Sequence, residues 1–260
     1  AGTGPYMLQS YTQGSGAILT KFDGYWGGWE GDHFDKVAFK VATENSSRRQ
    51  MVESGDIDVA LQMTPEDAEA LQSNPKLQVL VNSAAKNEVV FLNTKKAPLD
   101  NKLVRQALAY SYPYGDVIKY LKMDKYGSAP TDVVAPAILR GATESIPYTY
   151  DVNKAKELLQ QAGYPDGGFT LTVTYNTVCE DLKKILEFWK SRLSDVGITL
   201  DIQAMSWDAA YSQAKSQDPN KRSDLFAVEQ WSDTMTSMGV YATTVMTDAS
   251  WNFSAFSDKT

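Results

Sequence analysis

Carboxylates, a single cysteine and a single histidine are the side chains whose chemistry matters first. Glu53, Asp56 and Asp58 form the densest acidic cluster in the first half of the chain. Two carboxylates at a suitable separation can act as general acid and general base. The cluster flanks Ser54-Gly55, however, and such a small, polar context is typical of a solvated turn. We interpret these residues as a turn, which leaves a secreted hydrolase as the less favoured, enzymatic alternative.

Nucleophilic catalysis would need a base beside the thiol of Cys179. This cysteine precedes a predicted helix, whose N-terminal dipole can lower the pKa of a thiol. The one histidine, His33, lies between Asp32 and Asp35 in a predicted surface turn, so we interpret Cys179 as a bystander. The chain has no glycine-rich phosphate loop, no metal-spaced cysteines and no Gly-x-Ser-x-Gly elbow. The sequence therefore predicts no catalytic residue, no metal and no cofactor.

Composition limits the classes of partner. The 260 residues suffice for one large domain or two small ones, and 43% of them are hydrophobic, which is ordinary for a globular protein. A net charge of −7 argues against a nucleic-acid partner, because phosphates need clustered lysine and arginine. No apolar run approaches the roughly eighteen residues that span a bilayer. A single cysteine excludes an intrachain disulfide.

The stretch 89–110 contains the elements around which the chain is organised. Val89–Leu92 is a short apolar run that predicts a strand buried on both faces. Pro98 breaks the run, and Asp100 is a candidate N-cap for the following helix. Leu103–Leu108 then shows the apolar spacing of a helix. A strand, a corner and a capped helix predict the entry into an α/β domain.

A second signal for an α/β domain lies further along the chain. Phe169–Tyr175 alternates as a strand, Asp181–Val196 has one apolar helical stripe, and Ile198–Ile202 begins another strand. A crossover of this length predicts a parallel, right-handed βαβ unit. Leu225–Glu229 is a further apolar strand, followed by a predicted loop over Gln230–Met238. Because ligands bind at the carboxyl ends of such strands, this loop is the expected site.

The first 85 residues are expected to differ from the rest. Predicted strands cover Met7–Thr12, Ala17–Phe22 and Asp32–Val41, and another is expected at Leu77–Val81. The polar segment Asn82–Lys86 is the predicted boundary and hinge. The sequence therefore predicts a β-rich unit over residues 1–85 and an α/β unit over residues 86–260.

Three motifs resemble those of a known family. The first, at 89–110, is an apolar strand followed by Leu-Asn-Thr, then Ala-Pro-Leu-Asp-Asn, then Val-Arg-Gln-Ala-Leu-Ala-Tyr. The second is the segment YDVNKAKELLQQAGYPDGG at 150–168. The third is GTGPY at 2–6, followed later by YWGG. Together they resemble the solute-binding proteins of peptide-type ABC importers, family 5, whose members bind peptides, opines, some oligosaccharides or nickel chelates. Because that family is considerably longer, we interpret the chain as an internal fragment.

The resemblance implies a fold and a function. The fold would be periplasmic-binding-protein-like, type II, of the peptide-binding class, with one α/β lobe and a partial β-rich lobe. The intact protein would be a monomer and would not be an enzyme. It would be periplasmic or extracellular, as a cell-surface lipoprotein. Its two lobes would close on an oligopeptide or dipeptide and deliver it to a membrane permease. Six tryptophans and fourteen tyrosines keep an oligosaccharide open as the alternative ligand, because aromatic faces also stack on sugars.

The resemblance also implies a site. In the family the matching strand ends in a tryptophan, followed closely by an aspartate that pairs with the ammonium group of a bound peptide. Here one residue separates Trp231 from Asp233, where the peptide binders usually have two, and the Asp-Pro that often follows is replaced. This difference argues against an ion pair between Asp233 and an ammonium group, and it favours an uncharged ligand such as a sugar. The expected ligand-binding residues are Trp231, Asp233, Trp207, Asn87, Glu88, Thr234 and Met235.

Overall fold

The chain forms two compact units, residues 1–78 and residues 79–260. The division falls a few residues before Asn82–Lys86, because Ala85 already packs against a small apolar cluster of the second unit and accepts a hydrogen bond from the Ser232 N–H at 3.0 Å. This computed structural model describes residues 2–130, 132, 135–142 and 148–257.

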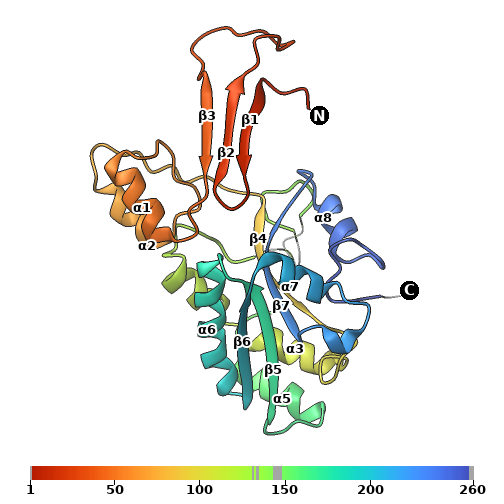
Figure 1. Ribbon diagram of the computed structural model, residues 1–260. Helices are drawn as coiled ribbons and strands as arrows, with labels where there is room; N and C mark the ends of the chain where they lie inside the picture. Colours follow the sequence, from red (N-terminus) through yellow and green to blue (C-terminus); the bar gives the residue numbers. More distant parts are fainter. Residues whose placement is uncertain (1, 131, 133–134, 143–147, 258–260) are drawn as a thin grey trace. The chain divides into compact units, whose positions relative to one another are not determined.

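The first unit contains a three-stranded antiparallel sheet in the order β1-β2-β3 (Figure 1). Its strands are β1 (Tyr6–Thr12), β2 (Gly16–Lys21) and β3 (Lys36–Lys40). The β1–β2 turn needs glycine, since Gly16 has a φ of 151° and a Cβ there would lie 2.0 Å from the Phe39 carbonyl oxygen. The predicted first two strands are confirmed, and the third is shorter than predicted.

Two helices, α1 (Asn45–Ser54) and α2 (Pro65–Gln72), complete the regular structure described for this unit. Gly55 ends α1 in the left-handed region at φ 82°. The predicted strand at Leu77–Val81 is wrong: no strand pairs with it among the residues that the structure describes. Leu80 and Val81 are exposed, 71% and 46% respectively, whereas Leu77 and Val79 are half-buried.

The second unit is built on a mixed four-stranded sheet in the order β4-β7-β5-β6. β5 lies parallel to β6 and to β7, whereas β4 pairs with β7 in the antiparallel sense. The predicted parallel βαβ unit is therefore confirmed. The strands are β4 (Lys86–Leu92), β5 (Phe169–Asn176), β6 (Ile198–Met205) and β7 (Leu225–Trp231).

Helices cover both faces of this sheet (Figure 1). One core cluster joins α3, α5 and α6 to one face, and a second joins α7 and the segment around Phe253 to the other. The helices are α3 (Lys102–Ser111), α4 (Tyr114–Asp116), the π-helix η1 (Val117–Leu121), α5 (Val152–Gln161), α6 (Glu180–Ser194), α7 (Trp207–Ala214), the 3-10 helix η2 (Pro219–Lys221) and α8 (Ser237–Thr244).

Two local predictions need correction. The N-cap of α3 is Asn101, whose side-chain oxygen accepts a hydrogen bond from the Leu103 N–H at 2.9 Å, and not Asp100. β4 is not buried on both faces, because it is the edge strand of its sheet and only Phe91 among its residues is buried. The amino end of β4 pairs with the carboxyl end of β7, so these two strand ends lie side by side at this edge of the sheet.

Candidate functional site

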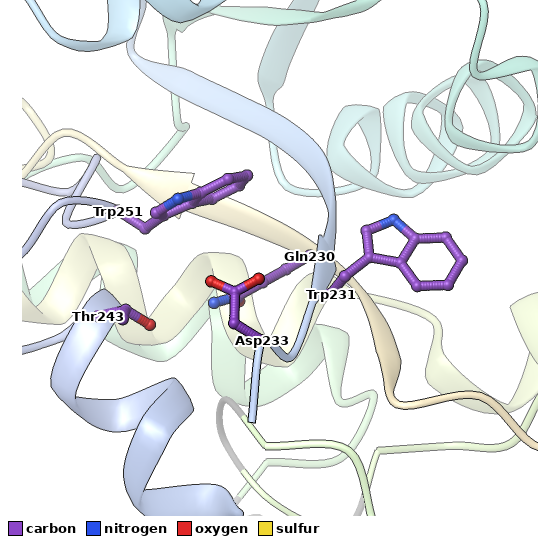
Figure 2. A pocket seen from close by; sticks show the side chains of 5 residues that line it. All are labelled: Gln230, Trp231, Asp233, Thr243 and Trp251. Atoms are coloured by element: carbon purple, nitrogen blue, oxygen red, sulfur yellow. The ribbon is translucent and has the colours of Figure 1, made fainter. Parts of the chain in front are cut away.

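β7 extends two residues further than predicted, which changes the geometry of the expected site. Gln230 and Trp231 are strand residues, opposite Asn87 and Lys86 of β4. Side chains alternate along a strand, so Gln230 and Trp231 point to opposite faces of the sheet. Figure 2 shows this directly: the Trp231 ring and the Gln230 side chain leave the strand end on different sides.

A depression of about 200 Å³ opens at this strand end (Figure 2). It lies wholly within the second unit. The residues that line it are two tryptophans, one aspartate, one glutamine and one threonine. They are Gln230, Trp231, Asp233, Thr243 and Trp251.

The loop that carries Asp233 is short and held at both ends. Ser232 continues the β4–β7 ladder through its hydrogen bond to the Ala85 carbonyl, at 3.0 Å. At the other end Thr236 caps α8, since its hydroxyl accepts from the Gly239 N–H at 3.3 Å. Asp233 is exposed between these two anchors. The carboxylate of Asp233 is therefore exposed to solvent, on a loop whose two ends are fixed by hydrogen bonds.

Gln230 is the buried member of the depression, with 5% of its surface exposed. Its Nε2 group donates to the hydroxyl of Thr244 on α8. Its Oε1 atom has no hydrogen-bond partner among the residues that the structure describes. The depression therefore contains a buried acceptor in addition to the exposed carboxylate.

The Trp231 ring lies on the opposite face, together with a charged pair. The Lys86 ammonium is 2.7 Å from Oε1 of Glu229 and 5.3 Å from the centroid of the Trp231 ring. Lys86 is the cross-strand neighbour of Trp231. Glu229 precedes Trp231 by two positions in β7 and therefore lies on the same face of the sheet. A cation held over an indole face attracts it electrostatically. The Lys86–Glu229 pair thus sets the position of a ring that is itself 51% exposed.

A second charged group continues along this face. The Lys122 ammonium lies 2.7 Å from Glu88 and 2.7 Å from Asp181. Burial lowers the pKa of Lys122, but the attraction of these two carboxylates outweighs it and holds the pKa above its ordinary value. Glu88 and Glu229 are direct cross-strand neighbours, an unfavourable arrangement for like charges that the two lysines neutralise.

Cys179 shows no sign of activation. Burial raises the pKa of its thiol to about 11, and the nearby carboxylates of Glu229, Glu88 and Asp181 add to the rise, against the opposing effect of Lys86. The pKa is thus raised, not lowered as a helix N-terminus can do, which agrees with the interpretation of Cys179 as a bystander. A thiol with so high a pKa is a weak nucleophile at neutral pH.

The expected site residues are distributed over both faces. Asn87 lies on the same face as Gln230, whereas Glu88 points to the other side and pairs with Lys122. Trp207 does not line the depression; its ring packs against that of Trp251, with centroids 6.1 Å apart.

Thr234 and Met235 are exposed in the loop and do not line the depression either. Sequence reasoning missed Thr243 and Trp251, which lie on α8 and beyond it. The only sequence signal for Trp251 is its residue type, since no motif or periodicity marks it.

The described parts of the chain contain no group of three or more His, Cys, Asp and Glu side chains arranged to hold a metal ion. No helix among those residues is both long and apolar enough to cross a membrane.

The fold and the comparisons with known proteins define the class. The architecture is that of type II periplasmic binding proteins of the peptide-binding class. Residues 1–252 match the family described as bacterial extracellular solute-binding proteins, family 5 Middle, and the chain belongs to this family. The resemblance seen in the sequence motifs is thereby confirmed.

Particular relatives can be named. The chain is 32% identical over 205 residues to the glutathione-binding protein GsiB of Salmonella paratyphi A, which covers 78% of this chain and 39% of the relative. It is 30% identical over 204 residues to GsiB of Escherichia coli strain K12, with the same coverage. The chain thus spans about two fifths of the length of these curated relatives.

Among solved structures, the peptide-bound DppA of Helicobacter pylori superposes with a TM-score of 0.87 at 25% identity, over 99% of this chain and 49% of DppA. NikA of Staphylococcus aureus, in complex with a nickel–histidine chelate, gives a TM-score of 0.86 at 18% identity, over 99% of this chain and 54% of NikA. At that identity the likeness shows the fold alone.

Proposed function

We propose that the protein to which this chain belongs captures short peptides and delivers them to the membrane permease of an ABC importer. The observation that carries the proposal is the presence of Trp231 and Asp233 on one depression at the carboxyl end of β7, in a chain of the family-5 solute-binding class. The protein acts in the periplasm or outside the cell, as a monomeric, lipid-anchored binder. It has no enzymatic and no nucleic-acid-binding role.

A peptide fits the charge of the depression. Asp233 is the one acidic side chain among its lining residues, which include no lysine or arginine. A free peptide N-terminus is a cationic group that such a carboxylate can pair with. A hydrogen bond to a charged group contributes roughly 1.5–3 kcal/mol. The name of the GsiB relatives, glutathione-binding protein, and the peptide bound to DppA support the same ligand class.

An oligosaccharide is the second candidate. The observation that favours it is the presence of two tryptophans, Trp231 and Trp251, among the residues of a depression that also contains Gln230 and Thr243, whose polar groups can bind hydroxyl groups. The shortened spacing between Trp231 and Asp233 points the same way. On this alternative, Asp233 accepts a hydrogen bond from a sugar hydroxyl and carries no ion pair.

Capture depends on closure of the two lobes around the ligand. A ligand stabilises the closed arrangement by its higher affinity for it. The predicted hinge, Asn82–Lys86, lies at the start of the second unit, a few residues after the division between the units. Scattering curves of the full-length protein should therefore change on saturation with peptide.

Calorimetry on the full-length protein tests the site. For a peptide with a free N-terminus, Asp233→Asn should weaken binding about 10- to 100-fold, because the charge-assisted bond is lost. Trp231→Ala should weaken binding of either ligand class, and Trp231→Phe should weaken it less because an aromatic ring remains.

The matched control is Asp195→Asn, because Asp195 is exposed at the carboxyl end of α6, at the opposite edge of the sheet. Unchanged affinity in Trp231→Ala would mean that the site is elsewhere. A silent Asp233→Asn beside an effective Trp231→Ala would favour the oligosaccharide.

A further inference from the structure

Gln230 carries a buried acceptor atom that lacks a donor. The residue is only 5% exposed and lines the depression with Asp233. Its Nε2 group donates one of its two N–H groups to the Thr244 hydroxyl, whereas Oε1 has no partner within the described residues. Native structures satisfy nearly all buried polar atoms, since an unsatisfied one is costly. The position of this oxygen at a depression indicates that a ligand supplies the missing donor.

The neighbouring polar atoms define what kind of donor fits. The Asp233 carboxylate accepts hydrogen bonds and donates none when ionised. The Thr243 hydroxyl has one proton, for which the carbonyls of Gly239 and Val240 are acceptors at 3.0 and 3.1 Å, so its remaining capacity is as an acceptor. Apart from the two indole N–H groups and the second N–H of the Gln230 carboxamide, the free hydrogen-bonding capacity of the lining side chains is therefore that of acceptors. A group with several N–H donors and a positive charge is complementary to it.

We propose that Gln230 is a ligand-binding residue, whose Oε1 accepts a hydrogen bond from the same ammonium group that pairs with Asp233. This inference rests on the proposed function. An ammonium group has three N–H donors, so a carboxylate and a carboxamide oxygen can bind it together. Figure 2 shows both side chains on one side of the strand end, with the Trp231 ring on the other.

The arrangement makes Gln230 a specificity residue for free amines. Acetylation of a peptide N-terminus removes the charge and leaves one N–H. An ammonium group can donate to the carboxylate and to the carboxamide oxygen at the same time, whereas a single N–H cannot donate fully to both. Loss of the Gln230 oxygen should therefore matter for a free peptide and hardly at all for its acetylated form.

The test uses full-length protein and two probes, the tetrapeptide Ser-Thr-Ser-Ala and its N-acetyl derivative, with affinities measured by calorimetry. Gln230→Met keeps the length of the side chain but removes the acceptor. We expect it to weaken binding of the free peptide about tenfold or more and of the acetylated peptide less than threefold. Gln230→Glu retains acceptor oxygens and should restore most of the lost affinity, which a purely structural role would not predict. Gln160→Met, on the exposed face of α5, is the control substitution.

Each outcome separates this inference from the proposed function. If the unsubstituted protein binds neither peptide, both the proposed function and the inference are overturned. If it binds the free peptide but Gln230→Met binds it equally well, the inference alone fails. Equal losses for the free and the acetylated peptide, or equal losses in Gln230→Met and Gln230→Glu, also overturn the inference, because they would assign Gln230 a packing role.

Discussion

Alternation along β7 decides which side chains can meet a ligand together. Gln230 and Asp233 share one side of the strand end, and Trp231 reaches the other side, where Lys86 and Glu229 hold its ring. A ligand that contacts both the carboxylate and the indole must therefore lie across the end of the strand. The paired strand β4 is part of this arrangement, because it supplies Lys86 opposite Trp231.

The contact between Lys86 and Trp231 yields a prediction that does not depend on the ligand. In full-length protein labelled with 5-fluorotryptophan, Lys86→Met should shift and broaden the Trp231 resonance in 19F spectra, which Trp231→Phe assigns. Lys86→Arg should preserve it more closely, because a cation remains over the ring. The expected loss of ligand affinity in Lys86→Met is about two- to fivefold, as for a cation–π contact of about 0.5–1 kcal/mol.

Lys96→Met is the matched control, since Lys96 forms a 2.8 Å pair with Asp224 at the other end of the same two strands. A Trp231 resonance that responds equally to both substitutions would show a general loss of stability and would contradict a specific role for Lys86.

The raised pKa of Cys179 predicts a slow, strongly pH-dependent thiol. With a pKa near 11 and not the ordinary 9, the thiolate fraction at pH 8 is about a hundredfold smaller. Alkylation by iodoacetamide should be correspondingly slow at pH 8 and should accelerate up to about pH 11.

Because the folded state keeps a proton that the unfolded chain releases near pH 9, this group also makes folding less favourable as pH rises from about 9 to 11. An alkylation midpoint at or below pH 9 in folded protein would contradict this environment for Cys179.

Residue types alone revealed only part of the site. Trp231 and Asp233 entered the candidate site because they follow the predicted strand Leu225–Glu229 in a family-like motif. Gln230 could not, because the prediction ended β7 at Glu229 and so gave Gln230 no face of the sheet. Asn87 and Glu88 were both expected near the ligand, and as consecutive strand residues they point to opposite faces of the sheet.

Element boundaries depend on local chemistry at their ends. Asp151 caps α5 as the sequence indicates, with its carboxylate accepting from the Lys154 N–H at 2.9 Å. Leu77–Val81 has the composition of a strand but lacks a partner strand in the described structure. Caps are encoded within a few residues and are predictable, whereas strand pairing depends on segments remote in sequence.

The turn between α6 and β6 contains a close backbone contact that a single substitution can test. Gly197 has a φ of 74°, and a Cβ there would lie 1.9 Å from the backbone oxygen of Asp166. Gly197→Ala should therefore lower the free energy of unfolding by about 3 kcal/mol or more, through backbone strain and a clash that a side-chain rotation cannot relieve.

Gly163 is the matched control, because its φ of 89° is similar but nothing lies within 4 Å of the added Cβ. Gly163→Ala should cost only about 1 kcal/mol. Urea unfolding of the two variants gives both values, and equal effects would contradict the close approach at Gly197.

The first unit exposes one apolar face of its sheet. Tyr11, Ala17 and Phe39 form one cross-strand row, and Leu8, Leu19 and Val37 form another on the same face. Tyr11 and Phe39 are 66% and 57% exposed. Contiguous apolar surface of this kind drives association when nothing covers it. We propose that further parts of the full-length protein cover this face.

The isolated chain of residues 1–260 should therefore self-associate, as measured by light scattering over a range of concentrations. Phe39→Lys should reduce association, whereas Ser10→Lys should not, because Ser10 pairs with Ile18 on the opposite face. A monomer at high concentration would contradict the exposed face as an association surface.

We expect the full-length protein to bind a short peptide at the end of β7 and to release it unchanged. The most direct measurement is equilibrium dialysis of full-length protein against one mixture of short peptides and one of oligosaccharides, with the retained compounds identified by mass spectrometry after release. We expect peptides with a free N-terminus to be retained and returned intact, and the Asp233→Asn variant to retain them no longer. Retention of no peptide, or recovery of cleaved products, would contradict it.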